Sequence, residues 1–387
     1  MTSTLRATLM DAVDKLPFWM VSAENRWLAI ASADNAAQMG DEIISLNGVP
    51  AAEIRAKMLP YQRADGMSSD AKRILQLHRD RNALGMMDIM WPLLFAPQNG
   101  RYTVQLKRSS AILNAQLAAT TIGIRDAAIA AQGTKPPSTA RAFKIENNIG
   151  VINLPTFAFW NSKFDWSKFL VDSFAELNAK NISHLVIDMR ANEGGNGAIN
   201  TTLLSYLLRT PYTPPAIRSV SAHKRAPYQL AKHLDTWNYG FFDRTGQMEK
   251  TVNNPLRFII KSTQNNDAPI MPRPSAYEGK TTVLISAENS SATFQLAEIL
   301  KQTGAATLID QTTAGNKRGL NSGQIAWVTL PNSGVAVDIP LLSTEPVAAQ
   351  PDAGVTPDVL VLQTFAARVA GADLEMAAAL KWIASGK

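Results

Sequence analysis

Two adjacent serines, Ser290 and Ser291, stand where an apolar run gives way to a helical pattern. The run TTVLIS ends at Ser286, and ATFQLAEILKQ then carries apolar residues at 294, 296, 299 and 300, as one face of a helix does. Ser291 is therefore predicted to lie at a helix N-terminus. The hydroxyl of Ser290 or of Ser291 can cap the helix, which contributes about 1 kcal/mol. It can also be a nucleophile, provided that a base takes its proton and N–H donors hold the oxyanion.

A glycine loop could supply those donors. ANEGGNG follows the apolar strand HLVIDMR (His184–Arg190) and opens a second predicted helix, AINTTLLSYLL. Helix N-termini expose unpaired N–H groups, and Gly194 and Gly195 let the backbone approach a ligand closely. By itself the loop is equally a plain strand-to-helix turn. The phosphate-binding and dinucleotide-binding glycine patterns are absent, and no G-x-S-x-G elbow surrounds either serine.

Composition places the chain among ordinary globular proteins. Its 387 residues are 46% hydrophobic and 18% charged, which leaves room for two domains. The net charge is +6, but Lys and Arg are scattered, so a nucleic-acid groove is not predicted. The lack of cysteine excludes disulfides, thiolate metal sites and a cysteine nucleophile. No spacing is typical of a metal site, and no apolar run is long enough to span a bilayer or to form a signal peptide.

The chain divides into regions that differ in their predicted secondary structure. Residues 16–131 contain short strands around the turn GDEIISLNGVP (Gly40–Pro50), with a helical insertion from about Ser69 to Asn82. Residues 132–144 are polar, carry two prolines and are the predicted linker. From residue 145 to 387, strands alternate with helices, which predicts an α/β core with parallel pairing. Within it, the stretch from Arg209 to about Gly279 is predicted to be irregular, as a lid or excursion.

The order of the motifs resembles a known family. The chain carries GDEIISLNG, IGVINLPTF, LVIDMRANEGGNG, VLISAENSSATFQLAEIL, IDQTTAGNKRG, and LPNSGVAVDIPL with GVTPDV. This order is similar to that of the tail-specific (C-terminal processing) peptidases, the S41 serine peptidases, and their tricorn-core relatives. The resemblance implies an α/β fold with a crotonase-like ββα core at 145–387 and a small PDZ-like β domain at 16–131. It also implies a serine endopeptidase that acts on polypeptides outside the cytoplasm, for example in the periplasm, without a cofactor.

The resemblance also assigns roles to individual positions. Ser291 matches the nucleophile, and the backbone N–H groups of Gly195 and Ala292 match the oxyanion hole. One branch of the family uses a lysine base; strict alignment places Asn316 there, so Lys317, one residue beyond, is the tentative base. The other branch uses a histidine just upstream of a segment like LPFW, with an acid near the position of Asp352. Residues 1–15 contain no histidine, and the histidines of the chain are His78, His184, His223 and His233.

The missing base leaves alternatives open. Residues 1–15 could be the remnant of a truncated region whose catalytic histidine lies upstream, or the protein could be a non-catalytic, peptide-binding pseudopeptidase. A crotonase-fold acyl-CoA enzyme is a further alternative, because that fold also pairs backbone N–H groups at an oxyanion. Such an enzyme would need a pocket for adenine and diphosphate, and no basic cluster lies near the glycine loop. The oligomeric state is left open.

Overall fold

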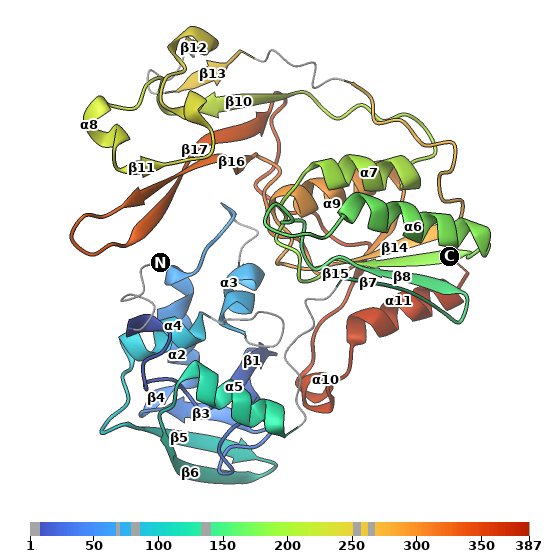
Figure 1. Cartoon of the computed structure of the whole chain (residues 1–387). Coiled ribbons are helices and arrows are strands. Elements are labelled where there is room, and N and C mark those ends of the chain that lie inside the picture. The colour runs from blue at the N-terminus through green and yellow to red at the C-terminus, as the bar shows by residue number, and fades with distance from the viewer. Residues whose placement is uncertain are drawn as a thin grey trace.

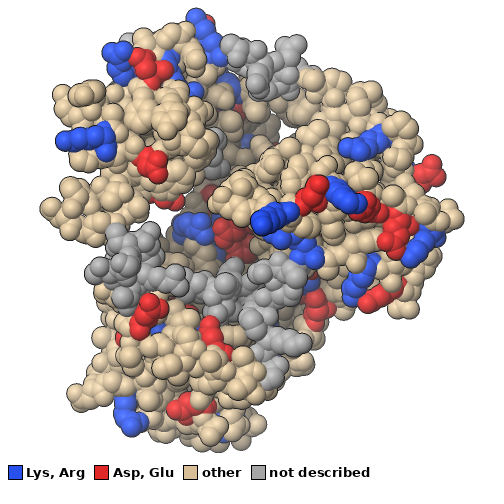
Figure 2. Space-filling view, viewed as in Figure 1, with Lys and Arg blue, Asp and Glu red and all other residues tan. Residues whose placement is uncertain are grey.

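Three sheets organise the chain (Figure 1). The structure is a computed structural model that describes residues 8–66, 70–78, 86–132, 141–250, 257–261 and 268–386. Within these ranges no helix is long and apolar enough to cross a membrane. No group of three or more His, Cys, Asp or Glu side chains there could hold a metal ion. Figure 2 shows basic and acidic side chains interspersed on this face, and a hollow between the lobe of the third sheet and the N-terminal domain.

The first sheet forms a small antiparallel domain with the order β1-β2-β3-β5-β6 and β4 paired to β3. Its strands are β1 (Phe18–Ala23), β2 (Arg26–Ser32), β3 (Glu42–Leu46), β4 (Val49–Pro50), β5 (Arg101–Arg108) and β6 (Ala111–Ala118). The hairpin turn between β3 and β4 is Asn47-Gly48, and both residues have positive φ, as a type I′ turn requires. Trp27, Trp91 and Tyr102 are fully buried in its core.

Helices and one 3-10 turn complete this domain: α2 (Ala51–Met58), η1 (Leu59–Tyr61), α3 (Asp70–Leu77), α4 (Met87–Leu94) and α5 (Ile122–Ala131). The predicted helical insertion from about Ser69 to Asn82 corresponds to α3, and its last part lies outside the described residues. The predicted linker 132–144 overlaps the next strand, because β7 begins at Ala142, and residues 133–140 also lie outside the description.

The second sheet is the core of the larger domain, with the order β18-β15-β14-β9-β8-β7. Its strands are β7 (Ala142–Glu146), β8 (Ile149–Asn153), β9 (His184–Asp188), β14 (Lys280–Ile285), β15 (Thr307–Asp310) and β18 (Val359–Leu360). All pairs from β8 to β18 are parallel, as predicted, and only β7 runs antiparallel to its neighbour. The carboxyl ends of β9 and β14 therefore meet at one edge of the sheet.

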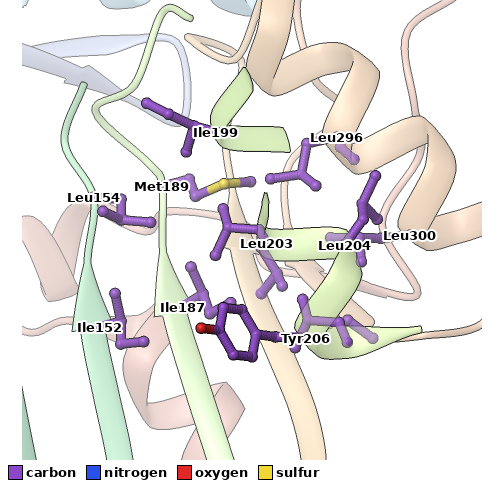
Figure 3. Packing of buried hydrophobic residues seen from close by; sticks show 14 of the residues in the cluster. Ile152, Leu154, Ile187, Met189, Ile199, Leu203, Leu204, Tyr206, Leu296 and Leu300 are labelled. Atoms are coloured by element: carbon purple, nitrogen blue, oxygen red, sulfur yellow. The ribbon is translucent and has the colours of Figure 1, made fainter. Parts of the chain in front are cut away.

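Helices cover both faces of this sheet (Figure 1). On one face lie α6 (Trp166–Ala179), α7 (Ala198–Leu207) and α9 (Ser291–Thr303), and on the other lies α11 (Leu374–Ala384). Side chains alternate along β9 accordingly: Leu185 and Ile187 join the cluster under α6, α7 and α9, whereas Val186 packs with Ala379 of α11. Figure 3 shows the first cluster, in which Ile187 of β9 packs near Leu203 of α7.

The third sheet corrects the prediction of an irregular excursion between Arg209 and Gly279. Its order is β11-β16-β17-β10-β13-β12. The strands are β10 (Ile217–Ser221), β11 (Leu234–Asp235), β12 (Met248–Lys250), β13 (Phe258–Ile260), β16 (Leu320–Thr329) and β17 (Ala336–Pro346), with α8 (Tyr228–Ala231), η3 (Tyr239–Phe241) and η4 (Thr245–Gln247) between them. The strands of the excursion are too short to show a period. Two of them, β10 and β11, pair with the predicted hairpin β16–β17, far along the chain.

A C-terminal helix that the sequence pattern did not indicate joins the two domains. α10 (Phe365–Ala370) packs on β2 of the first sheet. The guanidinium carbon of Arg26 lies 4.0 Å from the centre of the Phe365 ring, and Val369 lies against Gly40. The chain then enters α11 on the larger domain, so this segment bridges the domains.

Candidate active site

Ser291 lies in a strained turn between β14 and α9. Its φ is +50°, in the left-handed region that non-glycine residues rarely adopt. The preceding turn is fixed by the buried Asn289, whose Oδ1 accepts from the Ser286 N–H at 2.8 Å. The Asn289 side-chain nitrogen donates to the carbonyls of Met189 at 2.6 Å and Asn192 at 2.9 Å. The turn is thereby tied to the end of β9, and this surrounding structure holds the unusual backbone of Ser291 in place.

The hydroxyl of Ser290 does not cap α9. Ser290 occupies the N-cap position with an extended backbone, but its side chain makes no capping hydrogen bond. Its Oγ instead donates to the carbonyl of Glu193 at 2.9 Å. The interpretation of Ser290 as a capping residue is therefore wrong, because the neighbouring loop offers its hydroxyl a carbonyl acceptor. The hydrogen bond joins the serine turn to the glycine loop.

The glycine loop packs directly on the serine turn. Gly194 has a φ of +112°, and a Cβ built on it would lie 2.9 Å from the Cβ of Ser291 and 3.1 Å from the Ala292 nitrogen. Gly195 has a φ of +139°, and a Cβ there would lie 2.3 Å from the backbone of Phe157. No other residue type fits at either position without displacing backbone. The buried Asn192 side chain holds the loop, because its Oδ1 accepts from the Gly194 N–H at 2.9 Å and its Nδ2 donates to the Leu154 carbonyl.

Two backbone N–H groups lack an acceptor among the described residues where the loop meets the helix. Within the described ranges, neither the Gly195 nor the Ala292 N–H donates to a protein acceptor. The Ala292 N–H belongs to the first turn of α9, where no intrahelical acceptor exists. Asn200 anchors this turn from α7, since its Nδ2 donates to the Ala292 carbonyl at 2.7 Å. Both N–H groups predicted for an oxyanion hole therefore border the same turn as Ser291.

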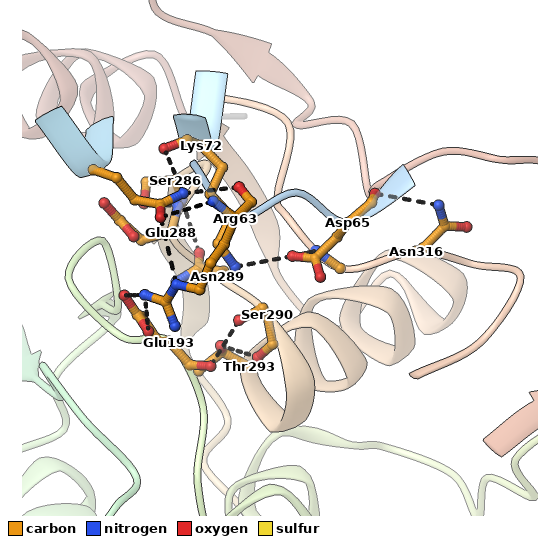
Figure 4. A network of polar contacts seen from close by, with 12 residues as sticks. Arg63, Asp65, Lys72, Glu193, Ser286, Glu288, Asn289, Ser290, Thr293 and Asn316 are labelled. Carbon is orange, nitrogen blue, oxygen red and sulfur yellow. Dashed lines mark hydrogen bonds and ion pairs between the residues drawn. The ribbon is translucent and has the colours of Figure 1, made fainter. Parts of the chain in front are cut away.

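A segment of the N-terminal domain also reaches this edge of the core (Figure 4). Asp65 accepts from Lys72 at 2.9 Å and from the Gly315 N–H at 3.2 Å. Asn316 donates to the Asp65 carbonyl at 3.3 Å and to Asp352 at 2.6 Å. Gly315 in turn abuts Phe294 of α9, because a Cβ there would lie 2.4 Å from that ring. The sequence motifs point to Asn316 and Asp352 but not to Asp65. No local pattern signals a contact between such distant parts of the chain.

Lys317 lies in the loop after β15, next to Asn316. Its N–H donates to the Ala353 carbonyl at 2.9 Å. Burial raises the pKa of Glu298, and the charge of Lys317 partly offsets that rise. Glu298 follows Ser291 by about two helical turns, which corresponds to roughly 10 Å along the axis. The tentative base thus acts electrostatically on the middle of α9 in this structure.

The histidines occupy other parts of the fold. His184 begins β9, opposite Lys280, so it lies at the far end of the sheet from Ser291, roughly 16 Å away along the strands. Burial and then the charge of Lys280 lower its pKa. His78 is buried, and its Nε2 accepts from the Ser22 N–H at 2.9 Å. His223 and His233 lie in the lobe of the third sheet, where His223 contacts the Phe241 carbonyl.

Arg190 links the start of the glycine loop to the C-terminal segment. Its guanidinium donates to Asp188 at 2.7 Å and to Asp373 at 2.7 Å. Burial alone would lower the pKa of Arg190, but the hydrogen bonds and charges of these carboxylates raise it. Burial alone would raise the pKa of Asp373, but the hydrogen bond and charge of Arg190 lower it to about 2. Asp373 also caps α11, because it accepts from the Met376 N–H at 2.9 Å.

Fold and site define the class of protein. It is an α/β protein with a small PDZ-like domain followed by a crotonase-like core. In the core, the N-terminus of a helix that begins with a serine packs against a glycine loop. The model of peptidase family S41 matches residues 148–361, more than half of the chain. The chain therefore belongs to peptidase family S41. This confirms the predicted family and fold class, and it makes the protein a member of a hydrolase family whose substrates are polypeptides.

Solved structures of mature CPAF agree on the fold. Mature CPAF complexed with lactacystin is 15% identical, with a TM-score of 0.59 over 96% of this chain and 83% of that one. Mature CPAF is 16% identical, with a TM-score of 0.57 over 92% and 79% of the two chains. The photosystem II D1 C-terminal processing protease is 15% identical, with a TM-score of 0.36 over 90% and 72%. A search of curated proteins finds no match.

Proposed function

We propose that the protein is a serine endopeptidase in which Ser291 forms an acyl-enzyme with its polypeptide substrate. The observation that supports the proposal is the close approach of Gly194 to Ser291 and to the Ala292 nitrogen, next to Gly195. The Ser291 Oγ attacks the scissile carbonyl carbon, and the Gly195 and Ala292 N–H groups stabilise the resulting oxyanion. Collapse of the tetrahedral intermediate expels the amine, and water then hydrolyses the ester to regenerate the serine.

The proposal keeps Lys317 as the tentative base. To act as the base, its amine would have to take the proton of the Ser291 hydroxyl. Substitution of Lys317 by Met tests this directly. If Lys317 is the base, acylation of Ser291 should slow by about 100-fold or more. An unchanged acylation rate would assign the base to another residue.

A fluorophosphonate probe tests the nucleophile. It should label the wild-type protein and the Ser290→Ala variant, whereas Ser291→Ala should not be labelled. Ser290→Ala is the matched control, because it removes the neighbouring hydroxyl and leaves Ser291 in place. Labelling that persists in Ser291→Ala would refute the assignment. A folded wild-type protein that binds peptides but is never labelled would instead be the non-catalytic relative.

By resemblance to the family, we also propose that the protein acts outside the cytoplasm. Fusion of the full chain, expressed from its own gene, to a reporter that folds only in an oxidising compartment tests this. An active reporter supports the proposal, and an inactive but intact fusion contradicts it.

A further inference from the structure

An ion pair between the two domains lies beside Ser291. Arg63, in the connection between η1 and α3, donates its Nη2 to both carboxylate oxygens of Glu193, at 3.3 and 3.4 Å (Figure 4). The side chain of Arg63 is 69% exposed and that of Glu193 is 43% exposed. An ion pair this exposed contributes little to stability. The guanidinium can therefore leave the carboxylate at little cost.

Glu193 is itself fixed next to the nucleophile. Its carbonyl accepts the Ser290 hydroxyl at 2.9 Å, and the residue that follows, Gly194, packs against the Cβ of Ser291. The Glu193 backbone therefore cannot drift from the serine turn, while its carboxylate points into solvent toward the N-terminal domain. A substrate segment bound across Ser291 must pass close to this carboxylate.

Gln76 holds the backbone of Arg63, because its Oε1 accepts from the Arg63 N–H at 3.2 Å and its Nε2 donates to the Arg63 carbonyl at 2.8 Å. The Arg63 Nε also donates to the Gln76 Oε1, at 3.4 Å, so only this long hydrogen bond and the pair with Glu193 hold the guanidinium among the described residues. The nearby acidic side chain of Asp65 is already engaged by Lys72 and the Gly315 N–H. Glu193 is thus a carboxylate at this edge whose partner is an exposed, replaceable cation; Asp352, which pairs with the exposed Arg318 at 3.0 Å, also accepts from Asn316.

We infer that Glu193 determines specificity by binding a lysine or arginine side chain of the polypeptide close to the scissile bond. Arg63 takes this place in the free protein and shows that a guanidinium fits there. The inference rests on the proposed function, because it assumes that substrate crosses Ser291. The inferred substrates are polypeptides with a basic residue next to the scissile bond.

The experiment compares peptides that differ at one position. Their affinities for the full-chain Ser291→Ala protein are measured by fluorescence anisotropy, with Lys, Arg, norleucine or Glu beside the intended scissile bond. The Lys and Arg peptides should bind about 5-fold or more tightly than the norleucine peptide at low salt, and less so at high salt, where exposed pairs are screened. Glu193→Gln should abolish the difference. Arg63→Ala should enlarge it, since the competing cation is gone.

A surface pair provides the control. Lys168 and Asp172 on α6 form an ion pair at 2.7 Å with similar exposure, far from the site in the fold, and Asp172→Asn should leave peptide preference unchanged. A preference for basic peptides that survives Glu193→Gln, or that Arg63→Ala weakens, overturns the inference.

The two proposals fail in different ways. Wild-type protein that is labelled at Ser291 and cleaves peptides without regard to basic residues disproves the role of Glu193 and leaves the peptidase intact. Protein that is never labelled, yet binds basic peptides through Glu193, disproves the peptidase and leaves the binding role.

Discussion

The Cα of Gly194 lies so close to Ser291 that a side chain on it would stand 2.9 Å from the Cβ of the serine. The two residues come from the ends of β9 and β14, which are parallel neighbours in the core sheet. Their contact packs the glycine loop against the turn that carries Ser291 and Ala292. The glycine is therefore a structural requirement of the candidate active site.

Gly194→Ala should impair the site without unfolding the protein. The new methyl group would strike the Ser290 carbonyl at 2.8 Å and would occupy a φ that alanine resists. Acylation by a fluorophosphonate should fall about 100-fold or more, in the range that loss of an oxyanion donor causes. Gly197→Ala is the control, because a Cβ there would meet no atom within 4 Å and its φ is negative. Equal labelling rates for both variants would contradict this role of Gly194.

Acid should weaken the attachment of the C-terminal segment through Asp373. The pKa of this carboxyl is lowered to about 2, so its contribution to stability is present above its unfolded pKa of roughly 4 and is lost as the pH falls toward 2. Asp373→Asn keeps a helix-capping side chain for α11 and removes the charge. Its unfolding midpoint should therefore vary less with pH between about 4 and 2 than that of the wild type, in chemical denaturation. Parallel pH profiles would exclude this contribution.

The buried pair in the N-terminal domain should be intolerant of truncation on one side. Arg125 is 1% exposed, and its Nη2 donates to Asp88 at 2.8 Å. Burial alone would lower the pKa of Arg125, but Asp88 and then Asp126 raise it, so the guanidinium stays charged. Asp88→Ala would leave the buried guanidinium with Asp126, which accepts from its Nε at 2.9 Å, so the unfolding free energy should fall by about 3 kcal/mol, the lower end of the range for a broken buried pair. Asp172→Ala, which breaks an exposed pair, should leave the unfolding free energy nearly unchanged.

Glu298 should cost stability at neutral pH. Burial raises its pKa above the usual value, although Lys317 offsets part of the rise. A carboxyl with a raised pKa favours folding when it is protonated, so its ionisation destabilises the fold as the pH rises above the unfolded pKa of about 4.3. Glu298→Gln should raise the thermal midpoint at pH 7, and the gain should vanish near pH 4. Lys317→Met should raise the Glu298 pKa further, which NMR titration would detect.

Local sequence patterns were sufficient to predict the elements of the core. The apolar run before Ser286, the helical spacing after Ser291 and the glycines of ANEGGNG predicted a strand, a helix and a loop where the structure has them. Asn47-Gly48 predicted its turn, because both residues accept positive φ. Such features depend on neighbours a few residues away. The order of these motifs also carried the family resemblance.

Tertiary structure decided which of these pieces meet. The hydroxyl of Ser290 bonds to Glu193 rather than capping its own helix, because parallel pairing of β9 and β14 brings the two loops together. The third sheet formed from an excursion that looked irregular, because its short strands gain their partners from the β16–β17 hairpin. The pair of Arg63 with Glu193 depends on the packing of one domain on another. Contacts between distant segments are set by strand register and domain packing, which no local pattern encodes.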